Sequence, residues 1–210
     1  DLDYCFQPIV SAHDGHVVAY EALMRPQLPI LRSPLTVMQL ASEMGRLYDI
    51  EKLTFFRVCE CYEELEAAGK LDADALIFVN SIASVSLSDE DWASYCEAHS
   101  AILPKLVVEI TEEEEMNERE LERKRNFPGA PGVFALDDYG SGYSNGNSLL
   151  TVAPKYVKVD IAIIRGIDTD ADKQQFLRAL IDYAHPRGVQ VLAEGVETLS
   201  ELRKVLEMGV

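Results

Sequence analysis

Three features that the sequence lacks narrow what this chain is. None of its apolar runs approaches the roughly 20 residues that a membrane-spanning helix needs, and its N-terminus lacks the charged, apolar and small-residue order of a signal peptide. Basic residues are scarce, because 19 Lys and Arg face 36 Asp and Glu, leaving a formal net charge of −17. Such a charge repels nucleic acid and anionic membranes unless bound cations offset it. We therefore expect a cytoplasmic domain that binds no bulk nucleic acid, although the full-length protein could be membrane-tethered.

Cysteine is also sparse, with four residues in a chain of 210. Cys59 and Cys61 lie two positions apart in a segment of helical periodicity, so their side chains diverge and do not form a metal site together. We predict that the cysteines are buried, reduced thiols, which suits a reducing cytoplasm.

What is present is an alternation of short β-branched runs with longer segments of helical period. This alternation is typical of βα units around a parallel sheet, and 210 residues with 48% apolar side chains suffice for one sizeable core. Helix starts are indicated by Ser33 before Pro34, by Ser88, and by Thr198 with Glu201 as a capping box. The predicted strands are Asp3–Val10, His16–Leu23, Ala75–Asn80, Leu106–Ile110, Val133–Asp137, Tyr156–Asp160 and Val189–Glu194.

Oxygen-bearing side chains recur where the predicted strands end. Asn80, Glu109, the pair Asp137 and Asp138, and Glu194 each follow an apolar run. In a barrel the carboxyl ends of the strands converge on one mouth, where active sites of this architecture lie. Carboxylates packed there without counter-charge repel one another, whereas divalent cations satisfy them. One such residue alone is more often a helix N-cap, but this many in one chain favour a metal site.

Blocks of sequence along nearly the whole chain resemble the EAL domain family. The segment Tyr20–Arg25 contains the Glu-Ala-Leu signature and the arginine that follows it. A three-letter match alone carries no weight, but the other blocks occur in the family's order, each at a strand end or in the loop that follows. They are Phe6–Val10, Phe78–Asn80, Glu109–Glu112, Leu136–Ser144, Val157–Asp160 and Ala193–Thr198.

The resemblance implies an α/β fold, a modified TIM (β/α)8 barrel whose first strand runs antiparallel to the others. We expect residues 1–210 to form a single EAL-type barrel domain that is C-terminally incomplete, truncated before the eighth strand and a loop glutamine of the family. The stretch Asn145–Ser148 is more polar and glycine-rich than its counterpart in the family, where this loop and the next helix contribute to dimerisation. Tyr139 replaces a more common Phe.

The activity that the resemblance implies is hydrolysis of the bacterial second messenger cyclic di-GMP to linear pGpG. Mg²⁺ or Mn²⁺ would be the working metal, two ions per site, and Ca²⁺ would inhibit. Two such cations neutralise phosphoryl oxygens and lower the pKa of a bound water to give hydroxide. One cation would be held by Glu21, Asn80, Glu109 and Asp137, and the second by Asp137, Asp138 and Glu194.

Three residues would take part in the catalytic step itself. Lys158 matches the family lysine that contacts the attacking water, and Glu194 is the best candidate to help deprotonate that water. The sequence leaves the choice of general base open. Glu197, together with Glu112, would fix the position of Lys158 and of the loop after Asp138.

Substrate binding would fall to residues near the signature. Arg25 would engage a phosphate oxygen, as a guanidinium is suited to do, and Gln7 and Leu23 would help seat the dinucleotide. Each role has a structural rival when taken alone, since Arg25 could pair with an acidic loop and Lys158 with Asp160.

Other functions are weaker interpretations of the same residues. A non-catalytic EAL domain, acting as a cyclic di-GMP sensor or protein-interaction module, usually lacks some of the ligand set, which is complete here. His13-Asp14 suggests a His-Asp type phosphodiesterase, but the remaining histidines lie in segments not expected to converge with it. A nucleotidyl cyclase domain is disfavoured within this span. We expect a homodimer, and a sensory, receiver or GGDEF domain could be fused to it.

Overall fold

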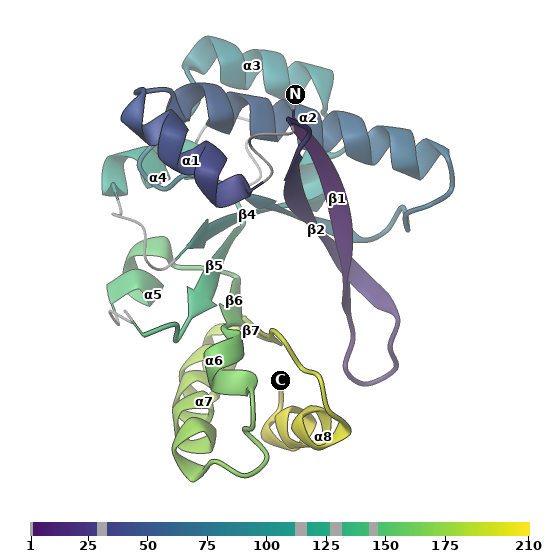
Figure 1. Ribbon diagram of the computed structural model, residues 1–210, viewed down its shortest axis with the longest axis vertical. Coiled ribbons are helices and arrows are strands. Elements are labelled where there is room, and N and C mark those ends of the chain that lie inside the picture. The colour runs from purple at the N-terminus through teal and green to yellow at the C-terminus, as the bar shows by residue number, and fades with distance from the viewer. Residues whose placement is uncertain (1, 29–32, 112–116, 127–131, 143–146) are drawn as a thin grey trace. The chain divides into compact units, whose positions relative to one another are not determined.

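A computed structural model of the chain describes residues 2–28, 33–111, 117–126, 132–142 and 147–210. Helices and strands alternate along these residues (Figure 1). The strands are β1 (Leu2–Val10), β2 (Val17–Pro26), β3 (Leu76–Asn80), β4 (Leu106–Thr111), β5 (Phe134–Tyr139), β6 (Tyr156–Val159) and β7 (Gln190–Ala193). The α-helices are α1 (Pro34–Glu43), α2 (Leu47–Ala67), α3 (Asp89–Ala98), α4 (Glu118–Asn126), α5 (Asn147–Val152), α6 (Ile161–Ile164), α7 (Ala171–Ala184) and α8 (Leu199–Met208), and Leu103–Lys105 and His185–Arg187 form 3-10 turns.

The sheet keeps the order of the chain, from β1 to β7. β1 pairs with β2 antiparallel, and Figure 1 shows the two as a long twisted ribbon. The pairs β2–β3, β5–β6 and β6–β7 are parallel, as expected where a helical crossover separates successive strands. The predicted fold class, a modified TIM barrel with an antiparallel first strand, is confirmed.

The chain divides into two compact units. The first contains β1 to β3, α1 to α4, and β4 up to Val108. Its core is built on an aromatic cluster in which Phe55 of α2 meets Trp92 and Tyr95 of α3 edge to face, at centroid distances of 5.2 and 5.5 Å. All three side chains are fully buried, so they supply much of the apolar area that holds the two helices together.

The second unit contains the end of β4, the strands β5 to β7, and the helices α5 to α8. The buried residues of α7 include Leu177, Leu180 and Ile181, which the helical period brings onto one face. Val205 and Met208 form the buried stripe of α8 in the same way. These two stripes give the unit its own core, on which the parallel strands are held.

The observed strand boundaries lie within a few residues of those predicted from the sequence. The largest difference is at β2, which was predicted to end at Leu23 but continues to Pro26, because the last residues of the strand still pair with the start of β1. The capping box of Thr198 at the start of α8 is confirmed, and Ser88 caps α3. Ser33 precedes α1 as predicted, but its side chain makes no capping hydrogen bond.

The prediction that the cysteines are buried is wrong for Cys5, which lies exposed on β1. Cys96 is half-buried, and Cys59 and Cys61 are buried and free. Burial raises the pKa of the Cys59 thiol to about 12, and its sulfur lies 3.1 Å from the hydroxyl of Tyr95. Throughout the described part of the chain, no helix has the length and apolar character that crossing a membrane requires.

Candidate active site

The second unit gathers four of the predicted acidic residues at its strand ends. Glu109 lies in β4, Asp137 and Asp138 lie in β5, and Glu194 directly follows β7. Between them in sheet order, β6 presents Lys158. The parallel register joins Lys158 to Leu192, two residues before Glu194. Residues separated by up to 85 positions in the sequence therefore occupy one end of a small parallel sheet.

The Lys158 ammonium is the centre of this group. Its Nζ lies 2.8 Å from Glu109 Oε1, 2.9 Å from Asp137 Oδ1 and 3.0 Å from Glu194 Oε1. The Lys158 side chain is only 2% exposed and the Glu109 side chain is fully buried, whereas the Glu194 side chain is 29% exposed. The cluster is thus buried at its base and open at Glu194. The sequence also allowed Lys158 to neutralise Asp160. The Asp160 carboxylate instead caps α6, and Lys158 pairs with the three carboxylates above.

A β-bulge brings two successive carboxylates together in β5. Leu136 pairs with Val157 and Tyr139 with Val159, so three steps along β5 match two along β6. Within this irregularity Asp138 has a φ of +55°, and its N–H donates to Asp137 Oδ1 at 3.0 Å. In a regular strand, neighbouring side chains point to opposite faces. The bulge breaks that alternation, which allows both carboxylates to serve one site.

The donor set suits a hard divalent cation. Asp137, Asp138 and Glu194 each offer a carboxylate oxygen, and these oxygens lie within 4.8 Å of one another. Oxygen ligands surround Mg²⁺ at about 2.1 Å, so ligands on opposite sides of it are about 4 Å apart. With Glu109, the group carries four carboxylates against the single ammonium of Lys158. This surplus of negative charge at closely spaced oxygens is what bound cations would offset.

Glu201 holds the loop that leaves Glu194. Its carboxylate accepts hydrogen bonds from the backbone N–H groups of Gly166, Glu197 and Thr198 at 2.8, 3.0 and 3.0 Å. These bonds lower the pKa of Glu201 to about 2. The sequence indicated Glu201 only as the partner of Thr198 in a capping box. Its hydrogen bond with Gly166, 35 positions away, could not be predicted from the residues around Glu201.

Gly195 closes the same loop directly after Glu194. Its φ of +66° is a left-handed conformation, and a Cβ there would overlap the side chain of Ile161. Only glycine therefore fits, and its close approach to α6 fixes where the chain turns after Glu194.

Glu197 is exposed and forms an ion pair with Arg165, a residue that the sequence interpretation did not single out. This contact lowers the pKa of the Glu197 carboxyl. The predicted influence of Glu197 on Lys158 stays a prediction. Glu112 lies outside the described residues.

In the first unit, one face of the β1–β2 ribbon carries the other predicted residues. Gln7 pairs with Glu21 across the ladder, and Leu23 and Arg25 follow on the same face because side chains alternate along a strand. The parallel register joins Glu21 to Phe78, so Asn80, two residues further along β3, shares this face.

The opposite face of the ribbon carries Tyr4 and Ala22, which are buried. Gln7 and Arg25 are exposed, and Arg25 donates to the carbonyl oxygen of Met24 at 2.9 Å. Ala19, on the same face as Glu21, is also buried, so the predicted residues lie on a partly buried face of the ribbon. Their predicted part in a cation or substrate site stays a prediction.

Comparisons with known proteins show which family this chain resembles. The chain is 28% identical over 94% of its length to the probable cyclic di-GMP phosphodiesterase PdeG of Escherichia coli, covering 40% of that protein. It is 30% identical over 96% of its length to the cyclic di-GMP phosphodiesterase NbdA of Pseudomonas aeruginosa, covering 26%. The chain thus spans less than half the length of these relatives.

The fold recurs among solved structures. The structure of Klebsiella pneumoniae BlrP1 in a manganese and cyclic di-GMP complex matches all of this chain and 53% of its own with a TM-score of 0.83, at 23% identity. The family model of the EAL domain matches residues 1–210. This chain belongs to the EAL domain family.

Proposed function

We propose that this domain is a metal-dependent phosphodiesterase that hydrolyses cyclic di-GMP to linear pGpG. The observation that carries the proposal is the convergence of the carboxylates of Asp137, Asp138 and Glu194. Lys158 forms ion pairs with Asp137 and Glu194. Membership of the EAL family and the names of its relatives supply the substrate. Carboxylate oxygens packed this closely suit the divalent cations that metal-dependent phosphodiesterases use.

The proposed cation ligands come from both units. In the second unit, Asp137, Asp138 and Glu194 are proposed to hold one cation. When bound, the cations would neutralise the phosphoryl oxygens and lower the pKa of a water molecule. The proposed ligand roles of Glu21, Asn80 and Glu109 rest on the family resemblance.

Lys158 and Glu194 are proposed to serve the attacking water. The buried ammonium fixes Glu109, Asp137 and Glu194 in one arrangement before substrate arrives, which lowers the reorganisation needed in the transition state. Glu194 is the most exposed of these three partners, so it is the one best placed to accept a proton from water. We therefore favour Glu194 over Lys158 as the general base.

Substrate contacts are proposed for the face of the β1–β2 ribbon that carries Gln7, Leu23 and Arg25. Arg25 is exposed, and the planar set of N–H donors of its guanidinium suits a phosphate oxygen. Gln7 and Leu23 share its face of the ribbon. Activity with Mg²⁺ or Mn²⁺, inhibition by Ca²⁺, a homodimer, a cytoplasmic location and fused regulatory domains stay predictions.

The test is incubation of the purified protein with cyclic di-GMP, with pGpG measured by chromatography and mass spectrometry. We expect pGpG with Mn²⁺ or Mg²⁺ and none with Ca²⁺. Asp137→Asn and Glu194→Gln should abolish it while circular dichroism stays unchanged. Glu207→Gln is the matched control, because this exposed carboxylate lies on α8 and forms an ion pair with Lys204 of the same helix. Tight binding of cyclic di-GMP without pGpG would replace the enzyme by a sensor.

A further inference from the structure

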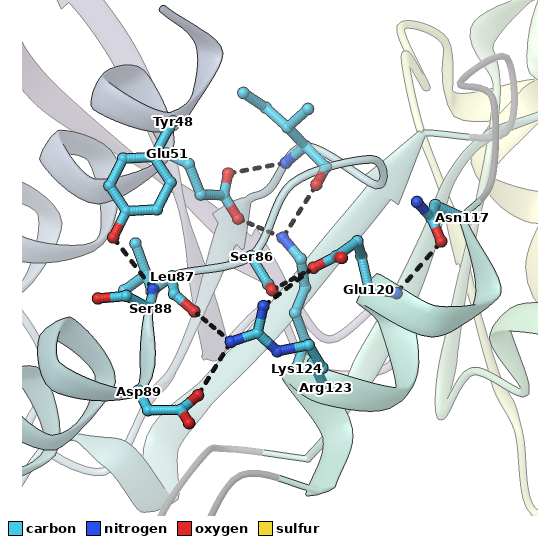
Figure 2. A network of polar contacts seen from close by, with 11 residues as sticks. Tyr48, Glu51, Ser86, Leu87, Ser88, Asp89, Asn117, Glu120, Arg123 and Lys124 are labelled. Carbon is cyan, nitrogen blue, oxygen red and sulfur yellow. Dashed lines mark hydrogen bonds and ion pairs between the residues drawn. The ribbon is translucent and has the colours of Figure 1, made fainter.

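A buried ion pair lies in the first unit. Lys124 of α4 and Glu51 of α2 form it, as Figure 2 shows. Both side chains are only 1% exposed. The two residues lie 73 positions apart in the sequence. Burying two charges costs folding free energy unless hydrogen bonds satisfy them. Apolar residues of similar volume in their place often give a protein that is equally stable. The pair therefore calls for a reason beyond stability.

Its hydrogen bonds point to one short segment, the two residues after Asn80. The Glu51 carboxylate accepts from the Ser81 hydroxyl at 2.6 Å and from the Ile82 N–H at 2.9 Å. The Lys124 ammonium donates to Ser81 Oγ at 2.5 Å and to the Ile82 carbonyl at 2.9 Å. Both polar groups of the Ile82 backbone and the Ser81 side chain are thereby fixed from two helices at once.

Two other residues of α4 contact the chain a few residues after Ile82. Figure 2 shows Arg123 reaching the Leu87 carbonyl, at 3.4 Å, and the Asp89 carboxylate, at 2.9 Å. Glu120 accepts a hydrogen bond from the Ser86 hydroxyl. The chain that leaves β3 is thus held from residue 81 to residue 89 by one face of α4, with the buried pair at the end nearest Asn80.

We infer that Glu51 and Lys124 are positioning residues for Asn80, fixing its amide beside Glu21 on the shared face of β2 and β3. Asn80 is the last residue of β3, so strand pairing restrains its backbone on one side only. On the other side, the clamp on Ser81 and Ile82 sets the direction of the chain, and with it the direction of the Asn80 side chain. This inference rests on the proposed function, in which Asn80 and Glu21 are ligands of one cation.

The test replaces both charges together, as Glu51→Leu with Lys124→Met, because a single replacement would strand a buried charge. Two readouts are used, neither of which depends on turnover. One is the affinity for Mn²⁺ alone, measured by electron paramagnetic resonance. The other is the side-chain amide signal of Asn80 in a ¹H–¹⁵N spectrum of metal-free protein, assigned by its loss in Asn80→Ala.

We expect the double variant to keep its circular dichroism, to bind Mn²⁺ about 10-fold more weakly or worse, as is usual when a support of a metal ligand is lost, and to shift or broaden the Asn80 signal. Lys52→Met is the matched control. Lys52 lies beside Glu51 on α2 and pairs with Asp91 at 2.8 Å, but its side chain is 46% exposed. It should leave both readouts unchanged.

If the double variant does not fold, Ser81→Ala is the variant to measure in its place. It removes only the hydroxyl at the centre of the clamp and should produce the same changes to a smaller degree. Wild-type Mn²⁺ affinity and an unmoved Asn80 signal, in whichever of these variants folds, would overturn the inference. So would an Asn80→Ala variant that binds Mn²⁺ normally. A wild-type protein that binds Mn²⁺ but yields no pGpG would defeat the proposed function alone.

Discussion

Replacing Lys158 by methionine tests whether its ammonium holds the carboxylates of the second unit together. The change keeps the length of the side chain and removes the charge, leaving Glu109 and Asp137 buried beside each other without it. Removing one partner of a buried ion pair costs roughly 3–5 kcal/mol. The contact to Glu194 adds little, because its side chain is 29% exposed and exposed pairs contribute about 0–1 kcal/mol. For a chain of this size, about 4 kcal/mol lowers the melting temperature by roughly 10 °C.

The assay is thermal unfolding in EDTA and again in excess Mn²⁺. Lys158→Met should melt about 10 °C lower in EDTA and gain more from Mn²⁺ than the wild type does, because a bound cation would replace the lost charge. Lys155→Met is the control, since Lys155 is an exposed lysine of the same unit whose ammonium contacts the Gly188 carbonyl. Melting of Lys158→Met within about 2 °C of the wild type in EDTA would refute the reasoning.

Three further predictions concern other residues. Glu21→Ala should abolish pGpG formation with the fold retained, because it removes a proposed cation ligand; turnover at the wild-type rate would overturn that role. Asp138→Gly should raise the free energy of unfolding in urea by up to about 1 kcal/mol, since glycine relieves the left-handed backbone, while weakening Mn²⁺ binding; a loss of stability would contradict the strain argument. The pKa of Glu201 is lowered from 4.5 to about 2, so the stability that its ionised form contributes is complete above pH 4.5 and is lost as the pH falls towards 2. The stability difference between wild type and Glu201→Gln should therefore shrink over that range, and a difference that stays constant with pH would count against it.

Much of the fold was predictable because its signals are local. Apolar β-branched runs bounded by glycine and acidic residues locate β3 to β7 to within two residues, and Thr198 with Glu201 marks the start of α8. The gathering of Glu109, Asp137 and Glu194 was predictable too, because parallel strands bring their carboxyl ends to one edge. These signals depend on pattern and strand direction, both of which a sequence displays.

The parts that were missed depend on contacts between distant segments. The bulge in β5 requires a positive φ at Asp138, a conformation that no residue type in the segment demands. Lys124 lies in the polar stretch Glu118–Asn126, whose composition is typical of a solvated helix. Its burial depends on Glu51, 73 positions away. Likewise, the family resemblance implied that Lys158 contacts water, whereas its ion pairs with three carboxylates were not predicted.

The most direct test of the account is to locate the cation. Crystals of the protein soaked in Mn²⁺ should give an anomalous difference peak, at the manganese absorption edge, bounded by the carboxylates of Asp137, Asp138 and Glu194. A well-ordered structure with no peak among these three residues, or with Mn²⁺ bound only elsewhere, would contradict the claim that they form a metal site.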